Sequence, residues 1–207
     1  MILPPTVPGI IKRLFPRRVW QIETEQKIAY ISFDDGPHER ITPMVLQLLE
    51  KHGALATFFC IGDRVKKHPA CFEQIKKAGH AVGNHTYHHV NGWKTDPKTY
   101  MEDVQESNAL IGSKMFRPPY GRLTSTQFHR LEQEGYKTIM WTILSGDYDK
   151  RLNPDQCTKR VLNALKPGSI ILFHDSEKAE KNMMVALENL LIEGTNGGYI
   201  FKSLNIN

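Results

Sequence analysis

The amino-acid sequence predicts an α/β fold in which about seven parallel strands form a (β/α) barrel. Two observations support this prediction. Short extended apolar segments alternate with helical segments along the chain, which requires parallel strands joined by helical crossovers, in a doubly wound sheet or in a barrel. Polar side chains follow strand ends in five separate units, and a barrel brings all of those ends to one mouth.

The first half of the chain contains three strand and helix units, beginning with the apolar run IAYISF, which is typical of a buried strand. The helix that follows ends at Gly53. Strands are expected at 28–33, 54–62 and 81–84, and helices at 41–53, 65–80 and about 97–111.

The second half repeats the alternation without an internal repeat, a low-complexity tract or a linker. One domain is therefore expected over 27–207, with a basic N-terminal segment, 1–26, packed on or beside the barrel. Strands are expected at 115–119, 136–144, 169–175 and 199–201, and helices near 125–134, 154–165 and 178–192.

The composition is that of a soluble globular domain: of 207 residues, 40% are hydrophobic and 24% are charged. No stretch approaches the ~20 apolar residues of a membrane span. The first positive charges follow the apolar residues, the reverse of a secretory signal. We therefore expect no transmembrane segment, no cleavable signal, and a cytoplasmic or peripherally membrane-associated protein. We also expect a monomer.

The net charge of +5 comes largely from the opening segment, which also contains Ile11, Phe15 and Trp20. Such a segment could touch an anionic membrane surface. Its prolines prevent a long amphipathic helix, so packing against the outside of the barrel is the preferred interpretation. The three cysteines lack Cys-x-x-Cys spacing, which argues against a disulfide framework or a thiolate zinc site and fits a reducing compartment.

Asp34 and Asp35 stand side by side at the end of the first predicted strand, directly before Gly36 and Pro37. Neighbouring side chains on a regular strand point to opposite faces, but Gly-Pro ends the strand and lets both carboxylates reach the mouth. A turn or a helix cap is the alternative interpretation for this pair taken alone.

Three histidines follow the third predicted strand in the sequence GNHTYHHV. His85 and His89 are four residues apart, so one helical turn would bring both imidazoles to one side, where they could bind a divalent ion at ~2.0–2.1 Å. His88 lies off that axis. Two imidazoles and one carboxylate leave coordination positions open, as a hydrolytic metal requires. The pattern therefore predicts a metal site.

Four short motifs resemble those of the polysaccharide deacetylases, the NodB-homology family 4 of carbohydrate esterases. They occur in the family's order, and the resemblance covers about 27–202. It implies a distorted (β/α) barrel and a metal-dependent hydrolase of non-peptide carbon–nitrogen bonds. Such an enzyme removes N-acetyl groups from amino-sugar glycans of the chitooligosaccharide or peptidoglycan type and releases acetate. The motifs are SFDDGP (32–37), HTYHH (85–89), RPPYG (117–121) and IILFHD (170–175).

The resemblance also implies how the metal and the base are arranged. Asp35, His85 and His89 would hold the divalent ion, for which zinc is the first choice, while cobalt, nickel or manganese would fit the same ligands. Asp34 would be the general base, oriented by Arg117. A dication and a guanidinium close by would also let two adjacent carboxylates stay ionised.

The other implied roles concern the leaving group and the acyl pocket. His174 would be the general acid that protonates the departing amine, helped by the neighbouring Asp175. Leu172 would form part of the pocket for the acetyl methyl group. The backbone N–H of Tyr120 would help to hold the oxyanion.

The fourth family motif, usually Asp-x-x-Asp-Trp, is altered in this chain. Leu144 replaces the first acid, Asp147 is kept, and Tyr148 replaces the tryptophan. Tyr148 can still offer an aromatic wall to a sugar ring, and either Asp147 or Asp175 can take over the electrostatic part. Trp93, just past the histidine motif, is a candidate for stacking on a sugar.

Other functions stay open at this point. The same barrel and metal could hydrolyse a different amide, such as a cyclic ureide or a formyl group, because neither the fold nor the metal fixes the acyl pocket. A non-catalytic glycan-binding module is the alternative from another class, and the intact acid, base and ligand residues argue against it. An N-acetylated glycan is thus the expected partner, since no aromatic and basic motif supports nucleic-acid binding.

Overall fold

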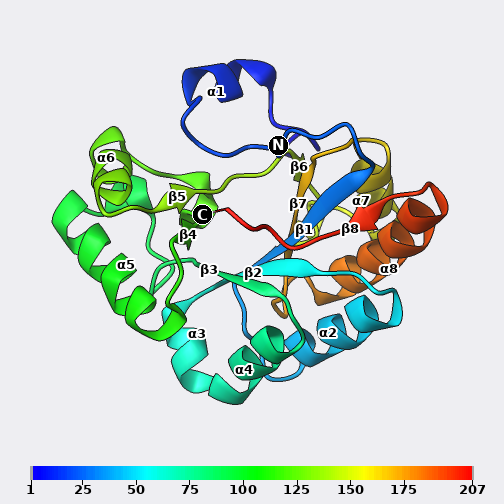
Figure 1. Cartoon of the computed structure of the whole chain (residues 1–207), viewed down its shortest axis with the longest axis horizontal. Coiled ribbons are helices and arrows are strands. Elements are labelled where there is room, and N and C mark those ends of the chain that lie inside the picture. Colours follow the sequence, from blue (N-terminus) through cyan, green and yellow to red (C-terminus); the bar gives the residue numbers. More distant parts are fainter. Residues whose placement is uncertain (1, 207) are drawn as a thin grey trace.

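The computed structural model describes residues 2–206 and shows parallel strands curled into a half-barrel (Figure 1). Met1 and Asn207, to which the expected bounds 1–26 and 27–207 extend, lie outside the described residues. Neighbouring strands pair in the order β5-β4-β3-β2-β1-β7-β6, with β8 beside β1, and all of these pairings are parallel. The predicted fold class is confirmed. The strands are β1 (Ile28–Asp34), β2 (Ala56–Cys60), β3 (Ala81–Asn84), β4 (Met115–Phe116), β5 (Lys137–Thr138), β6 (Ile143–Leu144), β7 (Ile170–His174) and β8 (Ile200–Phe201).

Helices surround the sheet, with α2, α3, α4, α5 and α8 fanned around its outside (Figure 1). In the described part of the chain, no helix is both long enough and apolar enough to cross a membrane. The α-helices are α1 (Gly9–Leu14), α2 (Ile41–Lys51), α3 (Gly62–Lys67), α4 (Pro69–Lys77), α5 (Pro97–Ile111), α6 (Ser125–Gln133), α7 (Pro154–Leu162) and α8 (Glu180–Asn196), and the 3₁₀ turns are Gly92–Lys94 and Pro119–Gly121.

Two predicted elements are divided in the structure. The helix expected at 65–80 is the pair α3 and α4, because Pro69 lacks an N–H and occupies the first turn of a new helix. The strand expected at 136–144 is the pair β5 and β6, which lie at opposite edges of the sheet. Only residues 139–142 connect these edges, so the sheet must curl until they are within ~18 Å of each other.

The N-terminal segment lies along both edges of the half-barrel. Val19 bridges in parallel to Ile139, next to β5, and Thr6 bridges in antiparallel fashion to Ile143 in β6. These backbone contacts occupy hydrogen-bonding groups that an open sheet edge would leave unpaired. Between the two contacts the chain forms α1, which projects from the barrel and has no buried residue (Figure 1).

Strand alternation separates the core from the interior of the barrel. Ile31 and Phe33 of β1 belong to the main hydrophobic core, where Phe33 stacks on Phe58 of β2 with ring centroids 4.9 Å apart. Ser32 and Asp34 alternate with them and therefore face the other side of the sheet. One strand thus anchors the helices with one face and supplies polar groups to the barrel interior with the other.

Candidate active site

The predicted site residues converge at the C-terminal ends of the central strands. Asp34 ends β1, His174 ends β7, and the two are direct register partners. Both line a cavity of about 330 Å³ together with Asp35, His85 and His89. The structure therefore places the two acids, the two motif histidines and the proposed general acid around one space.

The neighbouring aspartates face the same cavity because the strand ends between them. Asp35 has a φ of 81°, so it departs from the strand geometry that Asp34 still follows. The next residue must be glycine, because a Cβ at Gly36 would lie 2.1 Å from Oδ2 of Asp175. Asp175 accepts a hydrogen bond from the Thr42 hydroxyl at 2.5 Å, which keeps its carboxylate packed on this turn.

Asp35, His85 and His89 have the geometry of a metal site. Their ligand atoms all lie within 4.8 Å of one another. Oδ1 of Asp35 is 3.3 Å from Nε2 of His89 and 3.9 Å from Nε2 of His85. Two atoms bound to one ion at ~2.0–2.2 Å lie ~3–4 Å apart, so these separations fit a shared divalent ion.

Burial also favours the neutral form of the two imidazoles, which is the form that binds a metal. Burial lowers the pKa of His85 well below its usual value, and burial likewise lowers the pKa of His89. Nδ1 of His85 hydrogen-bonds to the backbone carbonyl of Arg117 at 2.7 Å, which leaves Nε2 to face the cavity. Such a contact behind a metal-ligating histidine fixes its tautomer and its orientation.

The segment that holds the histidines is not the helical turn that the sequence predicted. It is an irregular bend in which Thr86 and His89 have φ values of 64° and 57°. Asp103 of α5 holds the bend: its Oδ1 accepts backbone N–H bonds from Tyr87 at 2.6 Å and His88 at 3.1 Å, and its Oδ2 contacts Nδ1 of His88 at 2.6 Å. A carboxylate from a helix thus replaces the expected helical hydrogen bonds.

Backbone strain is concentrated at this site. Among the described residues, the non-glycine positions with positive φ are Asp35, Thr86, His89 and Tyr120. Each such residue costs ~1–3 kcal/mol and persists only where its surroundings determine the conformation. Asp35 and His89 belong to the metal cluster, Thr86 lies in the bend between the histidines, and Tyr120 lines the cavity.

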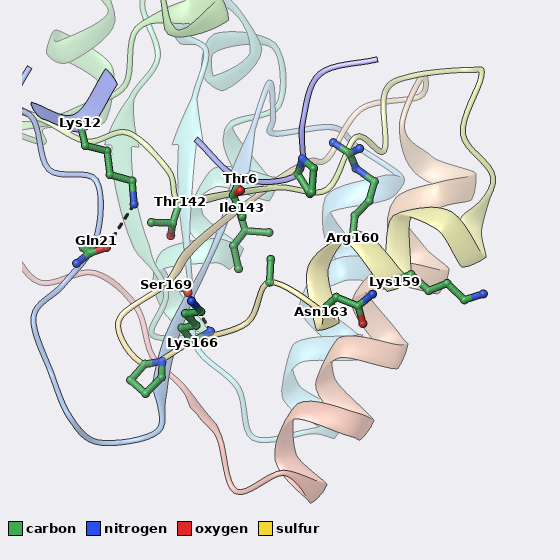
Figure 2. Close-up of a pocket in the computed structure, with 13 residues that line it drawn as sticks. Thr6, Lys12, Gln21, Thr142, Ile143, Lys159, Arg160, Asn163, Lys166 and Ser169 are labelled. Atoms are coloured by element: carbon green, nitrogen blue, oxygen red, sulfur yellow. Dashed lines mark hydrogen bonds between the residues drawn. The ribbon is translucent and has the colours of Figure 1, made fainter. Parts of the chain in front are cut away.

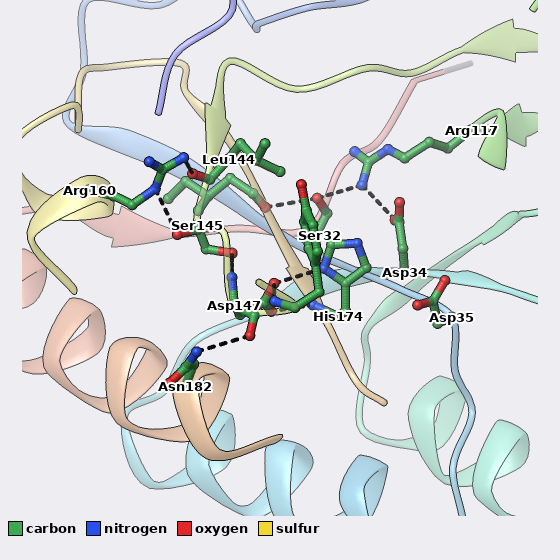
Figure 3. Close-up of polar contacts among 12 residues, drawn as sticks. Ser32, Asp34, Asp35, Arg117, Leu144, Ser145, Asp147, Arg160, His174 and Asn182 are labelled. Carbon is green, nitrogen blue, oxygen red and sulfur yellow. Dashed lines mark hydrogen bonds and ion pairs between the residues drawn. The ribbon is translucent and has the colours of Figure 1, made fainter. Parts of the chain in front are cut away.

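Arg117 is fully buried and contacts the proposed base directly (Figure 3). Its Nη1 donates to Oδ1 of Asp34 and to the hydroxyl of Ser32, each at 2.8 Å. Its Nε and Nη2 donate to the carbonyls of Ile139 and Met140. Burial lowers the pKa of the guanidinium, and Asp34 opposes that shift. Ser32 was missed from the sequence, although its place two residues before Asp34 puts it on the same strand face.

Asp147 is the partner of His174 (Figure 3), while Asp175 accepts a hydrogen bond from the Thr42 hydroxyl. Oδ1 of Asp147 contacts Nδ1 of His174 at 2.8 Å, and Oδ2 of Asp147 accepts a hydrogen bond from the backbone N–H of His174 at 2.7 Å. Burial by itself lowers the pKa of His174, but the charge and hydrogen bond of Asp147, with smaller contributions from the acids at the end of β1, raise it to about 9. Of the two acids left open by the altered motif, the geometry selects Asp147.

Only some of the residues proposed for the wall of the sugar site line the cavity. Leu172, Tyr148 and Tyr120 line the cavity, and the Tyr148 ring meets His174 edge-on with ring centroids 5.0 Å apart. Trp93 is 65% exposed, lies under the Arg122 guanidinium and is outside the set of lining residues. Its role in sugar stacking stays a prediction.

Several residues that line the cavity were given no role in the site from the sequence, Trp141 and Leu3 among them. Trp141 lines it from the connection between β5 and β6, and Leu3 from the N-terminal segment. The Leu3 carbonyl accepts a hydrogen bond from Arg160 of α7 at 2.8 Å, which fixes the segment there. No local pattern marks Leu3, because its position depends on a contact with a residue far along the chain.

Comparison with known proteins agrees with this geometry. Residues 21–139 match the polysaccharide deacetylase family. The chain is 33% identical over 195 residues to a peptidoglycan-N-acetylglucosamine deacetylase of Bacillus cereus, and the match covers 90% of each chain. It is 35% identical over 164 residues to a chitooligosaccharide deacetylase of Azorhizobium caulinodans, covering 75% of this chain and 77% of that relative.

A solved structure shares both fold and sequence with this chain. The crystal structure of a peptidoglycan N-acetylglucosamine deacetylase in complex with 4-naphthalen-1-yl-N-oxidanyl-benzamide matches with a TM-score of 0.86 at 29% identity, over 94% of each chain. The family match spans more than half of the sequence, and both relatives above are more than 30% identical over more than two thirds of it. The chain therefore belongs to the polysaccharide deacetylases of carbohydrate esterase family 4, which are hydrolases of non-peptide carbon–nitrogen bonds.

Proposed function

We propose that this chain removes N-acetyl groups from amino-sugar glycans of the peptidoglycan or chitooligosaccharide type, with a divalent ion held by Asp35, His85 and His89. One observation carries the proposal: three ligand atoms within 4.8 Å of one another lie beside Asp34 and His174, which end neighbouring strands. The relatives that are named as peptidoglycan and chitooligosaccharide deacetylases support the substrate class.

Asp34 acts as the general base in this proposal. When bound, a divalent ion supplies positive charge that acidifies water and polarises an amide carbonyl. Oδ1 of Asp34 is held by Arg117, and its Oδ2 lies 3.7 Å from Nε2 of His85, on the side of the ligand atoms. That oxygen is therefore placed to take the proton of the water that attacks the acetyl carbon.

His174 acts as the general acid. Its Nδ1 is engaged by Asp147, so Nε2 is the atom that donates a proton to the glycan nitrogen as the carbon–nitrogen bond breaks. A pKa of about 9 keeps this imidazole protonated at neutral pH. Protonation lets the nitrogen leave as an amine, with acetate as the other product.

The remaining cavity residues determine how the acyl group and the sugar fit. Leu172 and Leu144 provide an apolar surface for the acetyl methyl group, and Tyr148 provides an aromatic wall. We assign the backbone N–H of Tyr120 to the developing oxyanion, since Tyr120 lines the cavity next to the proposed metal ligand His89.

Zinc is the proposed ion. Two neutral imidazole nitrogens and one carboxylate oxygen match the ligand types that zinc prefers, although cobalt, nickel and manganese accept similar sets. A cytoplasmic or peripherally membrane-associated location stays a prediction from the sequence.

The test combines elemental analysis with an assay for released acids. The full-length protein, dialysed after loading with zinc, is expected to retain about one equivalent and to release acetate from N-acetylated chitooligosaccharides or peptidoglycan fragments. Asp34→Asn should keep the zinc and lose turnover, whereas His89→Ala should lose the zinc. Asp155→Asn, which changes an exposed acid in α7, is the matched control and should do neither.

Specific outcomes would contradict the assignments. Zinc retention by His89→Ala would remove the metal site from this cluster. Full acetate release by Asp34→Asn would remove the base. Release of formate or of a larger acid in place of acetate would show that the acyl pocket serves a different amide.

A further inference from the structure

The helix α1 carries an exposed apolar face. Ile10, Ile11 and Leu14 are 63%, 37% and 66% exposed, and Phe15, which follows the helix directly, is 41% exposed. At ~100° per residue the three helical side chains fall within ~100° of one another, so they form one side of the helix. None of the residues of α1 is buried, and we call Ile10, Ile11, Leu14 and Phe15 the α1 apolar face.

The segment 2–22 that contains this face has basic residues and no acidic ones. Residues 2–22 contain Lys12, Arg13, Arg17 and Arg18 and no aspartate or glutamate. Arg17 pairs with Glu132 of α6, and Arg18 is buried. Lys12 and Arg13, in the helix itself, are the cations that stay available beside the apolar side chains.

A second group of cations extends the positive surface next to α1. A cavity of about 720 Å³ is lined by Lys12 together with three further cations, Lys159, Arg160 and Lys166 (Figure 2). No acidic side chain of the described chain lines it. Lys12 contacts the amide oxygen of Gln21 at 3.4 Å. Burial and the nearby charge of Lys166 lower the pKa of Lys12, so an anion placed between the two lysines would be stabilised.

This surface is separate from the mouth of the barrel. Ser169 lines the cavity just before β7 begins, whereas His174 ends that strand five residues later. At ~3.3 Å per residue the two positions are ~17 Å apart along the strand. A partner on the α1 side can therefore bind without covering the metal ligands.

We propose that the α1 apolar face, with Lys12, Arg13 and Lys166, docks on the surface of an anionic lipid bilayer. Exposed apolar side chains next to basic ones are the pattern of an interfacial helix, whose apolar side enters the boundary of the acyl chains while its cations meet anionic headgroups. A six-residue helix offers a protein partner little area, whereas a fluid bilayer needs no complementary shape. The attachment is peripheral and reversible, and it does not depend on the deacetylase reaction.

The test is co-sedimentation of the full-length protein with vesicles. Binding is expected with vesicles of phosphatidylcholine that contain phosphatidylglycerol, and it should weaken as salt is raised from ~0.01 M to ~1 M, because screening shortens the reach of the cations. Vesicles of phosphatidylcholine alone should bind much less. The absence of binding to anionic vesicles at low salt would overturn the proposal, and so would equal binding to both compositions.

Substitutions test the cations and the apolar side chains of this surface separately. Lys12→Gln with Arg13→Gln should weaken binding to anionic vesicles ~25-fold, at ~5-fold for each cation removed. Ile10→Ser with Leu14→Ser should weaken it at least ~10-fold. Lys66→Gln with Lys77→Gln is the matched control, since these exposed lysines of α3 and α4 lie across the barrel from α1 and their loss changes the net charge equally (Figure 1).

The outcomes show whether a bilayer or a second copy of the chain binds this surface. If the control weakens binding as much as the α1 pair does, the net charge and not this surface explains the attachment, and the proposal is wrong. If the protein is dimeric, becomes monomeric in the Ile10→Ser, Leu14→Ser variant and never binds vesicles, a second copy is the occupant instead. Acetate release from a soluble oligosaccharide should be unchanged in every variant, which keeps this test independent of the proposed function.

Discussion

Charged side chains are partnered differently at the mouth of the barrel and on the α1 surface, which consists of the α1 apolar face with Lys12, Arg13 and Lys166. At the mouth, buried charges meet opposite charges from other strands: Arg117 contacts Asp34, and His174 contacts Asp147. On the α1 surface, Lys12 and its neighbours lie on a cavity that no acid lines within the described chain. A charge removed from water needs a partner inside the protein, whereas a solvated charge does not. The difference indicates that Arg117 and His174 find their partners inside the protein, whereas the cations of the α1 surface are available to an external partner.

The two regions are also attached to the sheet differently. The mouth residues Asp34 and His174 end β1 and β7, which lie inside the sheet and pair along most of their length. The segment around α1 contacts the sheet edges through isolated bridges at Thr6 and Val19. Substitutions at the mouth are therefore expected to change both folding and catalysis, and substitutions on α1 to change neither.

The largest effect is expected from Arg117→Met. This change leaves Asp34 and Ser32 buried without the cation that joins them, so the free energy of unfolding should fall by ~3–5 kcal/mol and acetate release should be lost. Urea denaturation and the acetate assay measure the two effects. Arg117→Lys is the control, since it keeps the charge but lacks the four-way hydrogen bonding. An unfolding free energy within ~0.5 kcal/mol of the parent for Arg117→Met would contradict the buried network.

The second largest effect is expected from Asp147→Asn, which should change how kcat depends on pH. The pKa of His174 is raised to about 9, above its ordinary ~6.5, so the acid form of the parent persists until the pH rises through about 9. Without the Asp147 charge, burial lowers that pKa, so the alkaline limb of kcat should move to lower pH and kcat near pH 8 should fall ~100-fold. The stabilisation from this pair is complete below about pH 6.5 and is lost as the pH rises toward 9.

The control for that experiment is Asp149→Asn, which removes a nearby acid that pairs with Arg151 instead of His174. Both variants are compared with the parent at the same metal loading, so that differences report on the Asp147 charge alone. An alkaline limb that stays in place for Asp147→Asn would mean that another group supplies the leaving-group proton.

The sequence predicted the fold and the three residues of the candidate metal cluster because local signals carry both. Alternating periodicity requires parallel strands with crossovers, and the sequences around Asp35 and His85 lie at strand ends. The helical turn expected between His85 and His89 was wrong, because the carboxylate of Asp103 supplies the hydrogen bonds of a bend instead. Spacing alone does not show a partner that lies on another helix.

Contacts between distant residues explain what the sequence left open. The motifs left both Asp147 and Asp175 open as the acid that acts on His174. In the structure Asp147 contacts the imidazole, whereas Asp175 accepts a hydrogen bond from Thr42. Leu3 reaches the cavity through Arg160, a residue far along the chain. Such pairings depend on the curled shape of the half-barrel, which no local window of sequence contains.

A smaller effect is expected from Asp103→Ala. This residue holds the bend between the histidine ligands without touching the cavity, so its loss should weaken zinc affinity ~10–100-fold while zinc-saturated kcat changes little. Competition with a chromophoric chelator measures the affinity. Glu102→Ala, an exposed neighbour on α5, is the matched control and should leave the affinity unchanged. An unaltered affinity in Asp103→Ala would mean that the bend holds its shape without the carboxylate.

The smallest effect on folding is expected from Leu14→Ser on the α1 surface. Leu14 is 66% exposed, so the substitution removes almost no buried apolar area, and the free energy of unfolding should change by less than ~0.5 kcal/mol. Leu187→Ala in α8 is the matched core substitution: that side chain is fully buried, and its truncation should cost ~2–5 kcal/mol. Urea denaturation of both proteins compares the regions directly. A loss of more than ~1 kcal/mol in Leu14→Ser would show that α1 packs on the barrel in solution, in which case its apolar side chains would be occupied by the protein itself and withdrawn from any bilayer.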